Sequence, residues 1–292
     1  MDKKYGTWQG RKALFIGDSL TAGRVYPEVV KEILGIETFY HCKGGASLKH
    51  IVDGDMGLGG EYDNETDASG ILRPLTPEDV ALMDLIVVYA GYNSRSLEIG
   101  AVGDLYKTDG TGQNTVAGNM QYVINRIYEN LCAANNMTCR LLIVTVDCSG
   151  KYPWVDADGY TEITPGSGKS LEAMANMQKQ VAAHNAIPCC DLFHTSGINP
   201  RTWALFSANP NPVNPDYSPY RLDETGNPVS YERIRYEMGE SYYQIRDGKV
   251  VLEKYEASAP YPYIGDQLHK SVAGYRRIGE VIAGAIIGAY GN

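Results

Sequence analysis

The stretch KALFIGDSL, residues 12–20, decides the expected fold. Its apolar run, residues 12–16, leads directly into Gly17, which is typical of a buried β-strand. Asp18 and Ser19 follow at once, and residues 26–34 then place apolar side chains at helical spacing before the stop at Gly35. The sequence therefore predicts a strand, a tight turn that carries Ser19, and a helix.

The same alternation continues along the chain. Apolar runs predict strands at residues 12–16, 36–42, 84–90, 140–146 and 187–193. Helical spacing predicts helices at 26–34, 47–52, 120–134, 171–185 and 272–290. Almost continuously apolar strands that alternate with helices indicate a parallel sheet covered on both faces. We expect a single α/β domain, residues 1–292, with three layers and a sheet of about five strands. Ligands bind beyond the carboxyl ends of such strands, so function is expected just after residues 16, 42, 90, 147 and 193.

Three stretches do not follow the alternation: residues 53–77, 95–118 and 200–262. The last contains eight of the fourteen prolines and many of the tyrosines, which predicts an inserted subdomain at about 200–262. Strand-like residues on both sides of Asp247-Gly248 predict a hairpin there.

Composition and charge exclude several function classes. The chain has 292 residues, of which 43% are hydrophobic and 21% charged, as in a folded globular protein. Its net charge is −9, and no Lys/Arg cluster exceeds two residues, so we expect no nucleic-acid partner. No apolar run has the roughly 18 residues that a membrane-spanning helix needs. The polar N-terminus shows no signal peptide, and the sequence leaves localisation and oligomeric state open.

Polar and glycine residues follow several of the predicted strands. Because the carboxyl ends of parallel strands meet at one edge, these residues are expected to lie together. They could supply a nucleophile, oxyanion donors and a base; alternatively, Ser19 could simply cap a helix. The four blocks are Gly17-Asp18-Ser19-Leu20, Gly44-Gly45, Gly91-Tyr92-Asn93 and Asp266-Gln267-Leu268-His269.

In this order, the four blocks resemble those of the SGNH (GDSL) hydrolase family. The resemblance covers nearly the whole chain and implies a flavodoxin-like sheet without a cofactor. It also implies that Ser19 is the nucleophile, His269 the general base and Asp266 the residue that orients the histidine. The oxyanion hole would consist of the N–H groups of Ser19 and Gly45 and the side chain of Asn93.

The physical chemistry of ester cleavage agrees with these roles. The reaction needs an activated hydroxyl, a base and donors aimed at the developing oxyanion, and a triad is recognised by roles rather than by chain order. Two points stay open. The third block commonly reads Gly-x-Asn-Asp, but here Ser94 replaces the acid, so how the loop is held is not evident. The sequence also does not decide between Gly44 and Gly45 as the donor.

The other motifs in the sequence predict neither a nucleotide-binding site nor a metal site. The segment 166–170 ends like a P-loop, but the first glycine of that motif is replaced by Ile163. His41, His50, His184 and His194 lack metal-site spacing, and His194 is expected to be structural, with a place in the cleft as the alternative. No Cys-x-x-Cys occurs, so Cys148, Cys189 and Cys190 are interpreted as buried thiols.

Family members are esterases, lipases and carbohydrate O-deacetylases. The polar, aromatic insertion and the lack of a long apolar lid favour an esterase that removes acetyl or another short acyl group from a carbohydrate. Asp18, Tyr92, Tyr261 and Tyr263 are expected to contact this substrate, because tyrosine rings suit sugar faces. The tyrosines could instead pack the insertion. The alternative function is a catalytically silent carbohydrate-binding or structural module, of the kind found on phage tails.

Overall fold

The computed structural model describes residues 7–54, 72–95, 97–107, 114–149, 154–155, 161–162, 170–199, 202, 206, 224–225, 241–246, 249–254 and 268–291. The chain divides into two compact units. The first contains Met1–Val146, Ala173–Leu192 and Arg276–Asn292, and the second contains Asp147–Glu172 and Phe193–Tyr275.

A five-stranded parallel sheet forms the centre of the first unit. Its strand order is β2-β1-β3-β4-β7, which is the flavodoxin-like order and confirms the predicted α/β class. Each strand pairs in parallel with its neighbours, as expected for strands that are connected through helices. The strands are β1 (Lys12–Gly17), β2 (Glu37–Cys42), β3 (Leu85–Tyr89), β4 (Arg140–Val144) and β7 (Cys189–Cys190).

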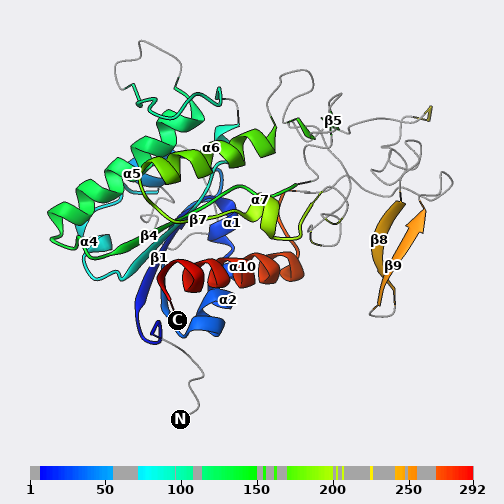
Figure 1. Cartoon of the computed structure of the whole chain (residues 1–292), viewed down its shortest axis with the longest axis horizontal. Helices are drawn as coiled ribbons and strands as arrows, with labels where there is room; N and C mark the ends of the chain where they lie inside the picture. The colour runs from blue at the N-terminus through cyan, green and yellow to red at the C-terminus, as the bar shows by residue number, and fades with distance from the viewer. Residues whose placement is uncertain are drawn as a thin grey trace. The chain divides into compact units, whose positions relative to one another are not determined.

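Helices cover both faces of this sheet, which gives the expected three layers (Figure 1). One layer contains α5 (Val116–Ala133) and α6 (Leu171–His184), and the other contains α2 (Val25–Leu34) and the first-unit part of α10 (Val272–Tyr290). The shorter helices are α1 (Ser19–Ala22), α3 (His50–Asp53), α4 (Pro77–Val80), η1 (Tyr92–Ser94) and α7 (Leu192–Thr195). None of the described helices is both long and apolar enough to cross a membrane.

The register of the sheet brings the carboxyl ends of its strands to one edge. Gly17 pairs with both Cys42 and Tyr89, Tyr89 pairs with Val144, and Val144 pairs with Cys190. Each of these residues is the last of its strand. The loops that follow β1, β2 and β3 therefore start at the same level, which is where ligands bind in open α/β sheets.

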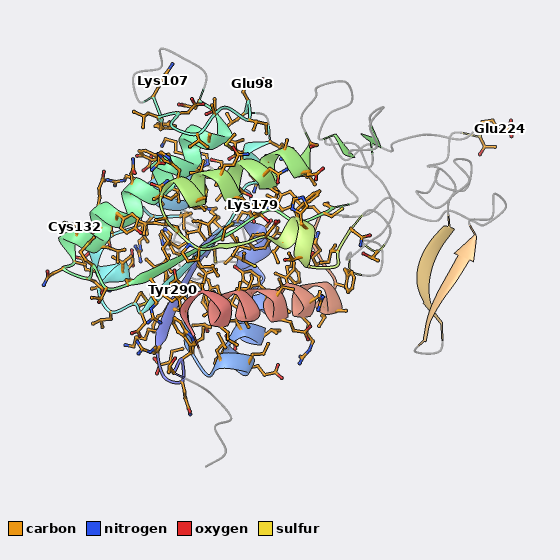
Figure 2. All side chains as sticks on the ribbon, viewed as in Figure 1. Glu98, Lys107, Cys132, Lys179, Glu224 and Tyr290 are labelled. Atoms are coloured by element: carbon orange, nitrogen blue, oxygen red, sulfur yellow. The ribbon has the colours of Figure 1, made fainter. Side chains whose placement is uncertain are left out.

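Close packing holds α10 on α2. A Cβ on Gly279 would lie 2.6 Å from the Cβ of Val29 and 2.7 Å from the carbonyl oxygen of Tyr26, so a larger residue would push the two helices apart. Tyr290 is the last residue of α10 (Figure 2), and its hydroxyl donates to the carbonyl of Leu141 at 2.6 Å. The predicted helix 272–290 is confirmed at both ends.

The second unit contains two short antiparallel ladders. β5 (Trp154–Val155) pairs with β6 (Thr161–Glu162), and β8 (Ser241–Arg246) pairs with β9 (Lys249–Lys254). Arg246 is opposite Lys249, so the hairpin predicted around Asp247-Gly248 is confirmed, with a two-residue connection. Most of the expected insertion at 200–262 lies outside the described residues, and its role as a subdomain stays a prediction.

One sequence prediction about an element was wrong, and one short helix was not predicted. The apolar run 187–193 forms only the two residues of β7 as strand, and Leu192 begins α7 instead. A short apolar run has the same appearance in a strand and in a buried helix, and only the pairing with β4 decides where the strand ends. The helix α4 was not predicted, although Thr76 and Asp79 form a capping box around its start and Pro77 is its first residue.

His41 is a buried histidine on the edge strand β2. Its side chain is 1% exposed, and neither ring nitrogen has a hydrogen-bond partner among the described residues. Burial lowers the pKa of His41 from 6.5 to about 4. The negative charge of nearby Asp79 raises this pKa in part, and the positive charge of Arg73 lowers it further. The folded protein therefore keeps this imidazole neutral where the unfolded chain would already bind a proton.

This difference predicts a pH-dependent loss of stability. The contribution of His41 is fully present above pH 6.5 and is lost as the pH falls toward 4, because only the unfolded chain takes up the proton in that window. Relative to His41→Leu, the wild-type free energy of unfolding should fall by about 1 kcal/mol per pH unit between these limits. Urea denaturation at several pH values measures this slope. His184→Leu, at an exposed position near the end of α6, is the matched control and should follow the wild type. Parallel curves for wild type and His41→Leu would contradict the prediction.

Candidate active site

Ser19 is the first residue of α1, directly beyond the end of β1. The turn depends on Gly17: a Cβ at this position would lie 2.1 Å from Oγ1 of Thr21 and 2.4 Å from the carbonyl oxygen of Tyr89. The carboxylate of Asp18 caps α1, since its Oδ1 accepts from the N–H of Leu20 at 3.0 Å. The alternative that Ser19 is the helix cap is therefore wrong. Ser19 itself is partly exposed.

A tight turn after β2 lies beside this serine. The N–H of Ala46 donates to the carbonyl of Lys43 at 3.2 Å, and Gly45 has φ +82° at the third position of the turn. That conformation favours glycine, as in a type II turn. Gly44 approaches the nucleophile candidate: a Cβ on Gly44 would lie 3.9 Å from the Cβ of Ser19. Gly45 thus shapes the turn, while Gly44 lies near Ser19, and both remain candidate oxyanion donors.

Asn93 connects the third block to the same turn. It lies in η1, beyond the end of β3, and its Nδ2 donates to the carbonyl of Ala46 at 3.1 Å. The next residue, Ser94, is 2% exposed, and its Oγ accepts from the N–H of Leu48 at 3.0 Å. Two hydrogen bonds therefore hold η1 against the loop that follows β2. The hydroxyl of Ser94 therefore helps to hold the loop after β2, although the acid that commonly ends the third block is absent.

Gln178 of α6 fixes the ends of the neighbouring strands. Its Nε2 donates to the carbonyl of Ala90 at 2.8 Å, and its Oε1 accepts from the N–H of Val146 at 2.8 Å. Gln178 is fully buried, and it also lies against Gly91, where a Cβ would approach its Nε2 to 2.9 Å. Sequence analysis missed this residue, because a single glutamine on a predicted helix gives no sign that it bridges two strands.

His269 belongs to the second unit, where it is partly exposed between two buried neighbours, Leu268 and Lys270. Nζ of Lys270 lies 2.9 Å from Oδ2 of Asp147, and this ion pair is almost completely buried. Burial raises the pKa of the nearby Cys148 thiol to about 12, so the thiol stays protonated at neutral pH. Sequence analysis missed the ion pair, since nothing in the local pattern connects two residues more than a hundred positions apart.

Several residues that the sequence predicts for the site are not placed in it by the structure. Asp266, Tyr261 and Tyr263 lie outside the described residues. Asp18 and Tyr92 are each 1% exposed, and their expected contact with substrate stays a prediction. His194 has a structural partner, as its Nε2 lies 3.1 Å from Oε1 of Glu172. In the part of the chain that the structure describes, no group of three or more His, Cys, Asp or Glu side chains could hold a metal ion.

Solved structures similar to this chain include those of several hydrolases. A possible lipase from Chitinophaga pinensis is 18% identical with a TM-score of 0.53, and the alignment covers 96% of this chain and 99% of that one. At this identity the likeness shows the fold alone, which agrees with the three-layer α/β architecture described above. A GDSL-like lipase from Bacteroides thetaiotaomicron has 14% identity, a TM-score of 0.39 and coverage of 96% and 89%. A catalytic mutant of an acetylxylan esterase from Geobacillus stearothermophilus has 12% identity, a TM-score of 0.41 and coverage of 97% and 96%.

No protein-family model matches the sequence, and no curated protein matches it significantly. At these identities the likeness concerns the fold. The parallel sheet places the ends of β1, β2 and β3 at one edge, and this edge carries Ser19, Gly44-Gly45 and Asn93.

Replacing Ser94 by Ala tests the connection between η1 and the turn. The change leaves the buried N–H of Leu48 without its acceptor, so the free energy of unfolding should fall by about 1–3 kcal/mol. The amide of Leu48 should also exchange its hydrogen faster. Urea denaturation and hydrogen exchange followed by mass spectrometry measure the two effects. Thr138→Ala is the control, since that exposed hydroxyl makes only a 3.4 Å contact with Asn136. Wild-type stability together with wild-type exchange at Leu48 would show that Ser94 does not hold the loop.

Proposed function

We propose that this protein is a serine esterase that removes acetyl or another short acyl group from a carbohydrate. One observation carries the proposal: the loop after β2 and η1 are hydrogen-bonded to each other next to Ser19, at the carboxyl edge of the sheet. A hydroxyl with several N–H donors around it is the arrangement that acyl transfer needs. The order of the four sequence blocks supports the same class of reaction.

In this proposal, the hydroxyl of Ser19 attacks the carbonyl carbon of the ester. His269 takes the hydroxyl proton as general base and returns it to the leaving alcohol, while Asp266 orients the imidazole. The resulting acyl-serine is then attacked by water, whose proton passes to His269 and back to Ser19 as the carboxylic acid leaves. The reaction needs neither a cofactor nor a metal.

The oxyanion that forms in each step would be stabilised by three donors. These are the backbone N–H groups of Ser19 and Gly45 and the carboxamide of Asn93. An Asn side chain has two N–H bonds, so the bond to Ala46 can fix the amide in place while its second N–H serves the oxyanion. A donor fixed before the reaction stabilises charge without reorganisation, and one such donor contributes about 100- to 1,000-fold to kcat.

Ser19→Ala should remove nearly all hydrolysis of p-nitrophenyl acetate while the fold is retained, because no other group supplies the attacking oxygen. The loss in kcat/KM should be about a thousandfold or more. Initial rates give this value, and circular dichroism checks the fold. Thr138→Ala, a change to an exposed hydroxyl, should leave the rate unchanged. A Ser19→Ala enzyme that keeps more than about a tenth of the wild-type rate would refute the nucleophile assignment. An inactive wild type that still binds carbohydrate would favour the silent binding module.

The tyrosines before the Asp266–His269 block should affect substrate choice rather than chemistry. If Tyr261 and Tyr263 bind the sugar, each ring contributes on the order of 1 kcal/mol of stacking that a small activated ester does not use. Their joint replacement by Ala should therefore reduce deacetylation of an acetylated oligosaccharide much more than cleavage of p-nitrophenyl acetate. Comparison of kcat/KM on the two substrates measures this. Equal losses on both would mean that the tyrosines support the catalytic loop instead.

A further inference from the structure

Lys270 is a fully enclosed lysine directly after the proposed catalytic histidine. Its side chain is 1% exposed, and that of its partner Asp147 is 0% exposed. The ammonium has three neighbours that accept hydrogen bonds or balance its charge: Oδ2 of Asp147 at 2.9 Å, the carbonyl of Leu268 at 3.0 Å and the carbonyl of Cys148 at 3.2 Å. All of these residues belong to the second unit.

A buried ion pair is weak evidence for stability, because removing two charges from water cancels much of their attraction. A pair of well-packed apolar side chains at these positions would hold the fold about as well. What an apolar pair could not do is donate to the carbonyls of Leu268 and Cys148. Those bonds are specific in direction, and they connect the residue before His269 to the loop that follows β4.

The other side of His269 is held by a second set of bonds. The N–H and hydroxyl of Ser271 both donate to the carbonyl of Phe206, at 2.7 and 3.1 Å. The same hydroxyl accepts from the N–H of Gly274 at 3.2 Å, which caps the start of α10. His269 is therefore preceded by a carbonyl bound to Lys270 and followed by the anchored start of a helix.

We propose that Lys270 is a positioning residue that fixes the backbone of His269 through its bonds to Asp147, Cys148 and Leu268. This inference rests on the proposed function for the identity of the histidine. Lys270 itself has no access to substrate, since its side chain is enclosed. It acts through the direction in which the imidazole is held, and a base that is misplaced by about 1 Å can lose about 100-fold in rate.

The test compares two double variants. Asp147→Asn with Lys270→Met removes both buried charges together and also removes the bonds to the two carbonyls. Lys270→Met alone would leave a buried carboxylate without its counter-ion and is less informative, because it could unfold the protein. The matched control is Lys179→Met with Asp191→Asn, which removes another Lys–Asp ion pair of this chain, one that is more exposed and belongs to the first unit (Figure 2).

Two readouts are measured on each variant: steady-state kinetics with p-nitrophenyl acetate and hydrogen exchange of residues 268–275. For Asp147→Asn/Lys270→Met we expect kcat to fall about 100-fold, with KM within about a factor of three of the wild type. Exchange in 268–275 should become faster, while a circular-dichroism melt still shows a folded protein. The control double variant should match the wild type in both readouts.

The two readouts separate failure of this inference from failure of the proposed function. Wild-type kcat in Asp147→Asn/Lys270→Met, or unchanged exchange in 268–275, would overturn the positioning role even if Ser19→Ala confirms the esterase. A wild type without esterase activity would overturn the proposed function. In that case the exchange measurement still decides whether Lys270 holds this segment.

Discussion

The absence of a side chain at Gly17 is the constraint on which the candidate site depends. It lets Thr21 lie against the end of β3, where its hydroxyl donates to the carbonyl of Tyr89 at 3.3 Å and also bonds to the hydroxyl of Tyr26 at 3.0 Å. Any Cβ at Gly17 would occupy the space of these atoms. The chain can therefore turn from β1 into α1 within one residue, and this turn brings Ser19 to the edge of the sheet.

The aromatic side chains beneath the turn make the same region rigid. Tyr26 packs edge to face on Phe15 and on Tyr89, with ring centroids 5.8 and 5.5 Å apart. Burial raises the pKa of Tyr26 well above its usual value, so its hydroxyl stays protonated and can act as a donor or an acceptor. This packing restricts the turn that carries Ser19, which suits the proposed role of Ser19 as a nucleophile.

Oxyanion donors are useful only if they are held before the reaction begins, and the proposed donor Asn93 is held through a backbone carbonyl. Asn93 is bonded to Ala46, and Ser94 is bonded to Leu48, so η1 and the glycine turn form one hydrogen-bonded assembly. The usual acid of the third block is absent, but a hydroxyl is sufficient for a backbone N–H.

The sequence by itself determined the class of fold, the order of the five sheet strands and the three blocks that follow β1, β2 and β3 at the edge of the sheet. These features are local: apolar periodicity, glycines at sharp turns and caps act over a few residues, so the chain shows them without its partners. The tertiary structure alone decided that Asp18 rather than Ser19 caps α1, that β7 stops after two residues and that Gln178 bridges β3 and β4. It also decided that Lys270 pairs with Asp147. Each of these features depends on atoms that come together from distant parts of the chain, or on adjacent residues that compete for the same hydrogen bond. Such contacts produce no periodic pattern in the sequence.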